Sequence, residues 1–140
     1  MKYVDIAKTC GMSLSTLYNV RAQNSGAHHM HTVFRVVFGL SRLLGEDVED
    51  LFVEYILGVI VYEYPEEDCD HIRDWLNRYK GCMTMKDLSC RVGIDQTRMS
   101  VWIHKGCYPS DVMLRWLIQA MDGSSEEICR SFFRMARPRV

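Results

Sequence analysis

The sequence predicts an all-α protein in which one arrangement, a short helix followed by a tight turn and a second helix, occurs twice. Three observations lead to this prediction. Residues 1–20 match residues 83–102 in size and polarity, apolar residues recur at helical spacing, and glycines or N-capping residues stand where helices should end or begin. We therefore expect two domains, residues 1–64 and residues 65–140.

The first copy of the arrangement begins with a short helix whose inner face carries Ile6 and Cys10, four positions apart. Ala7 is small enough to let a second helix cross closely, and Gly11 suits a sharp turn that needs a positive φ. Ser13 is a good N-cap for the following helix. Three further apolar residues complete the pattern, namely Met12 in the turn, and Leu17 and Val20 facing back to the first helix.

The second copy keeps the same size and polarity at the equivalent positions, which are Leu88, Ser89, Val92, Gly93, Ile94, Asp95, Met99 and Trp102. A further helix is expected before it, from about Asp70 to Tyr79, because apolar residues recur there on one helical face. Three boundaries are expected after it: a turn at Lys105-Gly106, a fourth helix opened by Pro109-Ser110, and a fifth opened by Ser125-Glu126-Glu127 that ends near Phe133.

Two further helices are also expected in the first half of the chain. One runs from Thr32 to Leu44 and ends at Gly45, and the next starts at Val48. The apolar segment 56–64 then fits a helix extension through Ile60 as well as a short strand from 59 to 64. Since a lone strand needs a partner, we expect this segment to lie in the core or in a dimer interface.

Both copies resemble the helix-turn-helix of the Cro/C1 (XRE-type) family. The residues that carry the resemblance are Ala7, Gly11, Met12, Leu17 and Val20 in the first copy and Ser89, Gly93, Ile94, Met99 and Trp102 in the second. The second copy resembles the whole family domain, whereas the first begins at the family's second helix. The resemblance implies tandem helix-turn-helix bundles in a cytoplasmic transcriptional regulator, a repressor of phage or mobile-element type. Such a protein binds double-stranded DNA as a homodimer and needs no cofactor.

The formal net charge of −1 conceals an uneven distribution. Residues 1–45 carry five basic and one acidic side chain, residues 46–68 carry nine acidic and no basic ones, and residues 69–140 carry twelve basic and eight acidic ones. The two mildly basic regions are compatible with a polyanionic partner. We expect the acidic run to be a solvated face and linker that lies away from DNA, because phosphates would repel it.

The resemblance implies that the second helix of each copy enters the major groove. In the second copy the expected base-reading residues are Gln96, Thr97, Ser100 and His104, with Arg98 and Lys105 on phosphates or guanine and with Thr84 and Lys86 against the DNA backbone. In the first copy the equivalents are Leu14, Ser15, Tyr18 and Asn19, flanked by Thr16 and Arg21. This first set is poorer in charge, so we expect it to bind DNA weakly or to contact a protein.

Motifs of other function classes do not occur. The sequence has no HExxH, GxSxG or phosphate-binding glycine loop, so we expect no enzyme. The six cysteines lack zinc-site spacing, and the histidines at 28, 29 and 31 are too few for a metal site. The apolar stretch Tyr55–Tyr62 is far shorter than the roughly 20 residues needed to cross a bilayer, so we expect no membrane association.

Two alternative functions remain open. The segments 11–20 and 32–52 resemble the N-terminal domains of some anti-CRISPR proteins. This second resemblance implies a protein-binding inhibitor with a helix-turn-helix body, which would also be able to regulate its own promoter. The charge-poor first copy favours the inhibitor, and the complete second copy favours the regulator. An antitoxin would combine operator binding with a protein partner.

Overall fold

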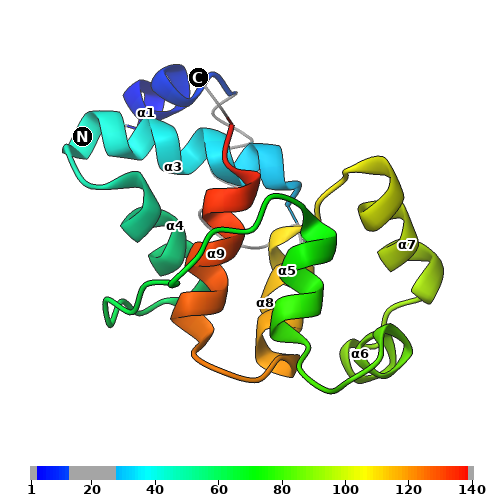
Figure 1. Cartoon of the computed structure of the whole chain (residues 1–140). Coiled ribbons are helices and arrows are strands. Elements are labelled where there is room, and N and C mark those ends of the chain that lie inside the picture. Colours follow the sequence, from blue (N-terminus) through cyan, green and yellow to red (C-terminus); the bar gives the residue numbers. More distant parts are fainter. Residues whose placement is uncertain (1–2, 13–27, 139–140) are drawn as a thin grey trace.

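The computed structural model describes residues 3–12 and 28–138, and within these ranges the protein is all-α, with no strand (Figure 1). Its helices are α1 (Tyr3–Cys10), α3 (Met30–Leu44), α4 (Val48–Leu57), α5 (Ile72–Tyr79), α6 (Met85–Val92), α7 (Gln96–Lys105), α8 (Asp111–Ala120) and α9 (Ser125–Ala136). The predicted all-α class is therefore confirmed. No helix of the described ranges is both long and apolar enough to span a membrane.

The helix ends follow the local chemistry of the sequence. Gly93, which separates α6 from α7, has a φ of 81° and donates its backbone N–H to the Ser89 carbonyl. This left-handed conformation is strained for any residue with a Cβ. Ser110 caps α8 by accepting a hydrogen bond from the Met113 N–H. Ser124 caps α9 in the same way, and α9 continues to Ala136, three residues beyond the predicted end.

The first helix of the chain packs closely on α3. Cys10 is buried on the inner side of α1, as predicted, and so is the small Ala7. The side chain of Ile6, predicted on the same face, lies outside the described part of the structure. Gly39 on α3 faces Cys10, and a Cβ at position 39 would lie only 2.2 Å from the Cys10 Sγ. The close approach of α1 and α3 therefore depends on Gly39 having no side chain.

Helix α9 lies in the middle of the molecule and packs against helices from both halves of the chain (Figure 1). The Phe133 ring contacts Phe34 on α3 and Phe52 on α4, with centroids 5.9 and 5.0 Å apart. The Phe132 ring meets Trp75 on α5 at 5.2 Å. The buried side chains of the two halves therefore form one continuous core, and α9 provides the apolar surface against which α3 and α4 pack. The division into two domains at residue 64 stays a prediction.

A buried carboxylate also connects the two halves. Asp111, the first residue of α8, accepts hydrogen bonds from the His28 N–H at 2.7 Å and from the Tyr55 hydroxyl at 2.8 Å. Burial and the neighbouring carboxylate raise the pKa of the Tyr55 hydroxyl above its ordinary value, so Tyr55 remains a hydrogen-bond donor. Arg115, one turn along α8, donates to two carbonyls in the last turn of α4, those of Tyr55 and Ile56.

Both alternatives that the sequence offered for residues 59–64 are wrong. Helix α4 ends at Leu57, because Gly58 turns the chain with a φ of 78°, and the residues that follow form neither helix nor strand. The N–H groups of Val61 and Glu63, which a strand would pair with a neighbouring strand, instead donate to the Glu126 carboxylate. Val59, Val61, Tyr62 and Tyr64 are exposed, so in this chain they do not belong to the core.

Candidate nucleic-acid interface

Helices α6 and α7 are joined by a short turn, which is the order of helix, tight turn and helix predicted for the second copy. After Gly93, the Ile94 N–H donates to the Ser89 carbonyl, and Asp95 caps α7 by accepting from the Thr97 N–H at 3.1 Å. Helix α7 ends at Lys105, where Gly106 has a φ of 67°. Figure 1 shows α6 nearly end-on and α7 running across the view, so the two helices cross steeply.

The inner side of this unit fixes how α7 is rotated. Met99 and Trp102 are buried, as are Leu88 and Ser89 on α6. Their burial against the core turns the opposite side of α7 to solvent. Five of the predicted base-reading or flanking residues lie on that side, and together with Val101 they line a shallow hollow of about 390 Å³: Gln96, Thr97, Ser100, His104 and Lys105.

Arg98 lies at one side of this hollow and does not line it. Its side chain is exposed, and one guanidinium nitrogen lies 3.6 Å from the Met113 sulfur on α8. A thioether is only a weak acceptor. The guanidinium can therefore leave Met113 for a phosphate or a base at little energetic cost.

The start of α6 carries both predicted backbone-contacting residues. Thr84 and Lys86 are exposed. The Thr84 hydroxyl accepts from the Asp87 N–H at 3.1 Å, and the Asp87 carboxylate accepts from the Thr84 N–H at 3.3 Å. This capping box places a negative charge at a helix N-terminus, where it opposes an approaching phosphate. Lys86 supplies the compensating positive charge, so we expect it to carry more of any phosphate contact than Thr84.

The residues predicted for the first copy cannot be placed in the same way. Leu14, Ser15, Thr16, Tyr18, Asn19 and Arg21 lie outside the described residues. The DNA contact predicted for them therefore stays a prediction.

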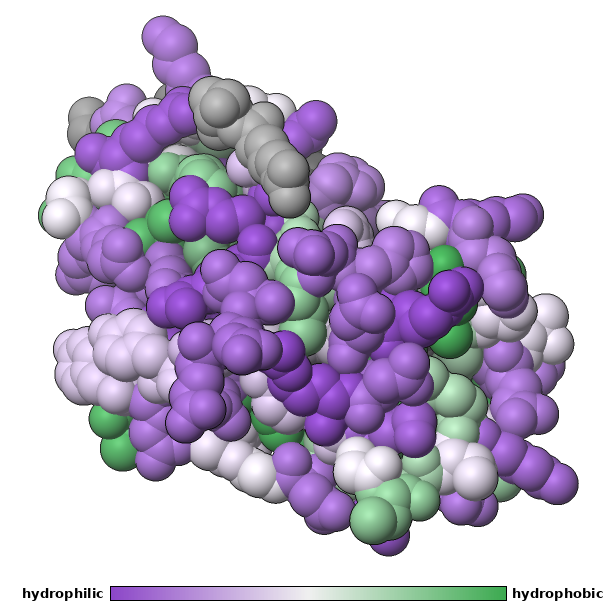
Figure 2. All heavy atoms as spheres, in the orientation of Figure 1, coloured by the Kyte–Doolittle hydropathy of each residue, from purple (hydrophilic) through white to green (hydrophobic). Residues whose placement is uncertain are grey.

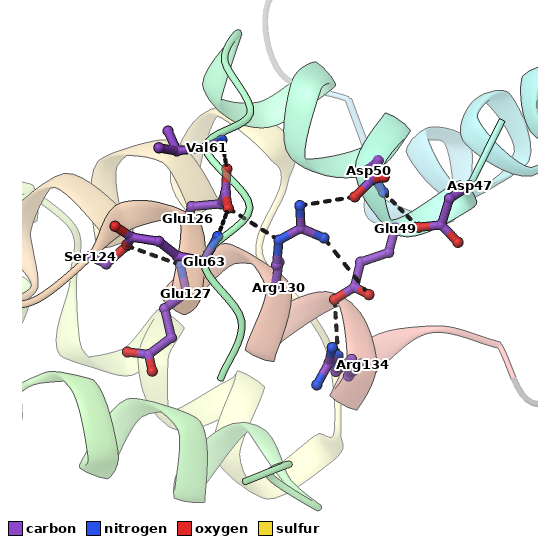
Figure 3. A network of polar contacts seen from close by, with 10 residues as sticks. All are labelled: Asp47, Glu49, Asp50, Val61, Glu63, Ser124, Glu126, Glu127, Arg130 and Arg134. Carbon is purple, nitrogen blue, oxygen red and sulfur yellow. Dashed lines mark hydrogen bonds and ion pairs between the residues drawn. The ribbon is translucent and has the colours of Figure 1, made fainter. Parts of the chain in front are cut away.

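A buried arginine is the largest feature that the sequence analysis missed. Arg130 on α9 is 0% exposed, and its guanidinium lies 2.9 Å from Asp50 and 3.8 Å from Glu49 on α4 (Figure 3). It also lies 3.3 Å from Glu126, one turn earlier on α9. The ring of Tyr64 covers it, with the guanidinium carbon 4.4 Å from the ring centroid.

This network corrects the prediction for two residues of the acidic run, while the other seven acidic residues between 46 and 68 are exposed, as predicted. We expected a solvated face, but Glu49 and Asp50 are half-buried and face α9, where Arg134 also pairs with Glu49 at 2.9 Å. The i, i+4 spacing of Glu126 and Arg130 on a predicted helix was the signal available in the sequence. Sequence spacing could not predict that Glu49 and Asp50, on another helix, would complete the network.

Glu126 holds the irregular segment after α4 against the start of α9. Burial alone would raise the pKa of its carboxyl group, but the N–H groups of Val61 and Glu63 and the Arg130 guanidinium outweigh burial and lower that pKa below its ordinary value. Glu126 is therefore ionised at neutral pH and binds the two backbone amides as a carboxylate.

The described residues contain no group of three or more His, Cys, Asp or Glu side chains arranged to hold a metal ion. The rings of His29 and His31 stack with centroids 5.6 Å apart. Cys82, Cys90 and Cys107 are exposed and Cys69 and Cys129 are buried, all five as free thiols.

Comparisons with protein-family models, with curated proteins and with solved structures found no match to this chain. The likeness to the Cro/C1 family therefore depends on the residues quoted above.

Proposed function

We propose that this chain is a sequence-specific DNA-binding transcriptional regulator that reads the major groove with α7. One observation carries the proposal. The exposed side of α7 bears polar and basic residues, and the helix contains no carboxylate, while Met99 and Trp102 anchor its other side in the core. A helix of ten residues is about 15 Å long, which suits a major groove about 12 Å wide.

The proposed base contacts follow from the donor and acceptor groups along α7. Gln96 would bind adenine through its amide, and Arg98 would bind guanine or a phosphate. Each well-aligned contact between a side chain and a base contributes about 1–3 kcal/mol of discrimination against the wrong base. Thr97, Ser100 and His104 supply further polar groups to base edges. Lys105 and Lys86 would contact phosphates and fix the orientation of the helix.

The regulatory mechanism would be occupancy of an operator. A repressor of phage or mobile-element type that covers a promoter blocks RNA polymerase, and this step requires neither catalysis nor a cofactor. The cytoplasmic location predicted from the sequence belongs to the same proposal.

Selection of bound duplexes from a random library tests the proposal. The selected sequence and a scrambled duplex of the same composition would then be titrated at about 0.15 M salt, where a specific complex should be preferred by roughly a thousand-fold. Loss of this preference in Gln96→Ala would assign the selectivity to α7. Recovery of no motif, with weak binding that disappears as salt is raised, would overturn the proposal.

A second candidate function is a protein-binding inhibitor of the anti-CRISPR type. The observation in its favour is the group of exposed apolar side chains in the irregular segment after α4, at Val59, Val61, Tyr62 and Tyr64. Apolar side chains exposed together in one region are typical of surfaces that bind proteins. An inhibitor would retain its effect when Gln96 and Arg98 are replaced, whereas a DNA-binding regulator would lose it.

A further inference from the structure

An apolar groove with a basic rim lies on the outer side of α3. It has a volume of about 320 Å³ and is lined by His31, Phe34, Arg35, Phe38, Arg42 and Pro138. The phenylalanines form its floor, and His31, Arg35 and Arg42 are exposed at its edge. No acidic side chain lines this groove among the described residues. We call this feature the α3 groove.

An apolar projection with acidic neighbours lies elsewhere on the same chain. It comprises residues 62–67, Tyr-Glu-Tyr-Pro-Glu-Glu, in which Tyr62 is 63% exposed and Glu63, Glu66 and Glu67 are exposed. We call it the Tyr62 projection. Figure 2 shows mainly hydrophilic atoms on the face drawn, with paler and green atoms uncovered at its lower left edge, where Figure 1 places the segment after α4.

The Tyr62 projection is held in an unfavourable backbone conformation by hydrogen bonds. Tyr62 has a φ of 64°, the one positive value found for a non-glycine residue among the described residues. This left-handed conformation is unfavourable for an L-residue with a Cβ. The buried Glu126 carboxylate fixes the N–H groups on both sides, those of Val61 and Glu63. Backbone strain maintained by surrounding contacts often marks a binding surface, and here it presents an apolar ring to solvent.

The two features cannot meet within one copy of the chain. The Tyr62 projection is attached near the first turn of α9, through Glu126, whereas Pro138 of the α3 groove follows the end of α9. Helix α9 has twelve residues and is therefore about 18 Å long. A tyrosine side chain cannot bridge that distance, so Tyr62 can reach only the α3 groove of another copy.

We propose that two copies of this chain associate by placing the Tyr62 ring of one in the α3 groove of the other. The apolar floor of Phe34 and Phe38 would cover the ring, and Glu66 would face Arg35 and Arg42 at the rim. Glu67 is already paired with Arg78 of its own chain at 3.4 Å. A buried tyrosine removes about 150–250 Å² from water. The paired charges would fix the orientation of the contact. The proposal goes beyond DNA binding and does not depend on it.

Charge complementarity and the composition of the groove favour a second copy over a phosphate backbone. Phosphates are fully hydrated anions, and they would leave the apolar floor uncovered. The Tyr62 projection offers an apolar ring and carboxylates within six residues, which matches the floor and the rim together.

Sedimentation equilibrium of the full chain tests the proposal through charge reversal. Arg35→Glu/Arg42→Glu and Glu66→Lys should each raise the dissociation constant of the pair by at least about tenfold. An equimolar mixture of the two variants should regain the association, because each contact then joins opposite charges again. Arg73→Glu and Glu54→Lys, which reverse exposed charges elsewhere, should leave the dissociation constant unchanged.

A second pair of variants tests the apolar part. Tyr62→Ser should weaken the pair, whereas Trp116→Ser, which removes another exposed aromatic ring, should not. Circular dichroism would verify that every variant is folded. A wild-type chain that stays monomeric at its highest soluble concentration would overturn the proposal, and so would failure of the mixed charge-reversed variants to associate. Gln96→Ala should not alter the average mass measured by sedimentation equilibrium. The test of self-association is therefore independent of the test of DNA binding.

Discussion

The guanidinium of Arg130 on α9 lies 2.9 Å from the carboxylate of Asp50 on α4, and the arginine is completely buried. A charge in this position requires partners, and Glu49, Asp50 and Glu126 provide them. The ion pair of Arg130 and Asp50 joins α9, from the second half of the chain, to α4, the last helix of the first half. Stability and its dependence on pH therefore both relate to the environment of α9.

Replacement of Arg130 should destabilise the protein strongly. Arg130→Ala leaves three carboxylates close together in a poorly solvated site, and removal of one partner of a buried ion pair typically costs about 3–5 kcal/mol. Urea unfolding followed by circular dichroism would measure the loss. Arg134→Ala is the matched control, because Arg134 also pairs with Glu49 but is partly exposed, so its loss should be about 1 kcal/mol or less. Equal losses would contradict the role assigned to burial.

The lowered pKa of Glu126 predicts a loss of stability in acid. A carboxyl group with a lower pKa in the folded state stabilises the fold above its unfolded pKa, about 4.3 for glutamate, and this contribution disappears as pH falls towards the folded pKa. Denaturation midpoints between about pH 7 and pH 3 should therefore decline more steeply for the wild type than for Glu126→Gln. Glu127→Gln, one residue along α9, should keep the wild-type slope, and a flat wild-type profile would refute the prediction.

Gly39→Ala should separate α1 from α3. The new Cβ would lie 2.2 Å from the Cys10 Sγ and 3.2 Å from the Cys10 Cα, and overpacking of this kind costs about 1–3 kcal/mol. Cys10→Ala should rescue part of the loss, because it removes the closer of the two clashes. Unfolding of the two single variants and the double variant would give the coupling energy. Additive effects would show that the two helices do not meet at these residues.

Tyr62→Gly should be more stable than Tyr62→Ala. Both variants remove the exposed ring, and only glycine adopts a φ of 64° without steric cost. We expect a difference of about 1 kcal/mol in the free energy of unfolding. A more stable alanine variant would mean that the segment relaxes to a negative φ in solution.

DNA binding should depend on individual side chains of α7 in different ways. Lys105→Ala should weaken binding to all duplexes and reduce the salt slope by about 1, as expected for one lost phosphate contact. If Arg98 contacts a phosphate, Arg98→Ala should also weaken binding to all duplexes. If it contacts a base, Arg98→Ala should reduce the preference for one base pair of the selected site, which titration against single-base variants of that site would detect. Arg73→Ala, on the exposed side of α5, should have little effect. Equal losses from all three would indicate nonspecific charge attraction.

The sequence by itself determined the helices and where most of them end. Gly93, Asp95 and Ser110 act within four residues of their own positions, and the burial of Met99 and Trp102 follows from helical spacing. For this reason the side of α7 that faces solvent, and with it the candidate residues from Gln96 to Lys105, could be named before the structure was known.

Only the tertiary structure decided how the two halves are joined. The sequence shows that Arg130 and Glu126 share a helical face, but not that Asp50 and Glu49 would meet them, because periodicity reports local spacing and not which distant helix packs opposite. The same holds for residues 59–64, whose apolar composition suited a helix or a strand. Their conformation was set by a hydrogen-bond acceptor more than sixty residues away, the Glu126 carboxylate. Contacts of this range depend on the packed fold, and no local pattern encodes them.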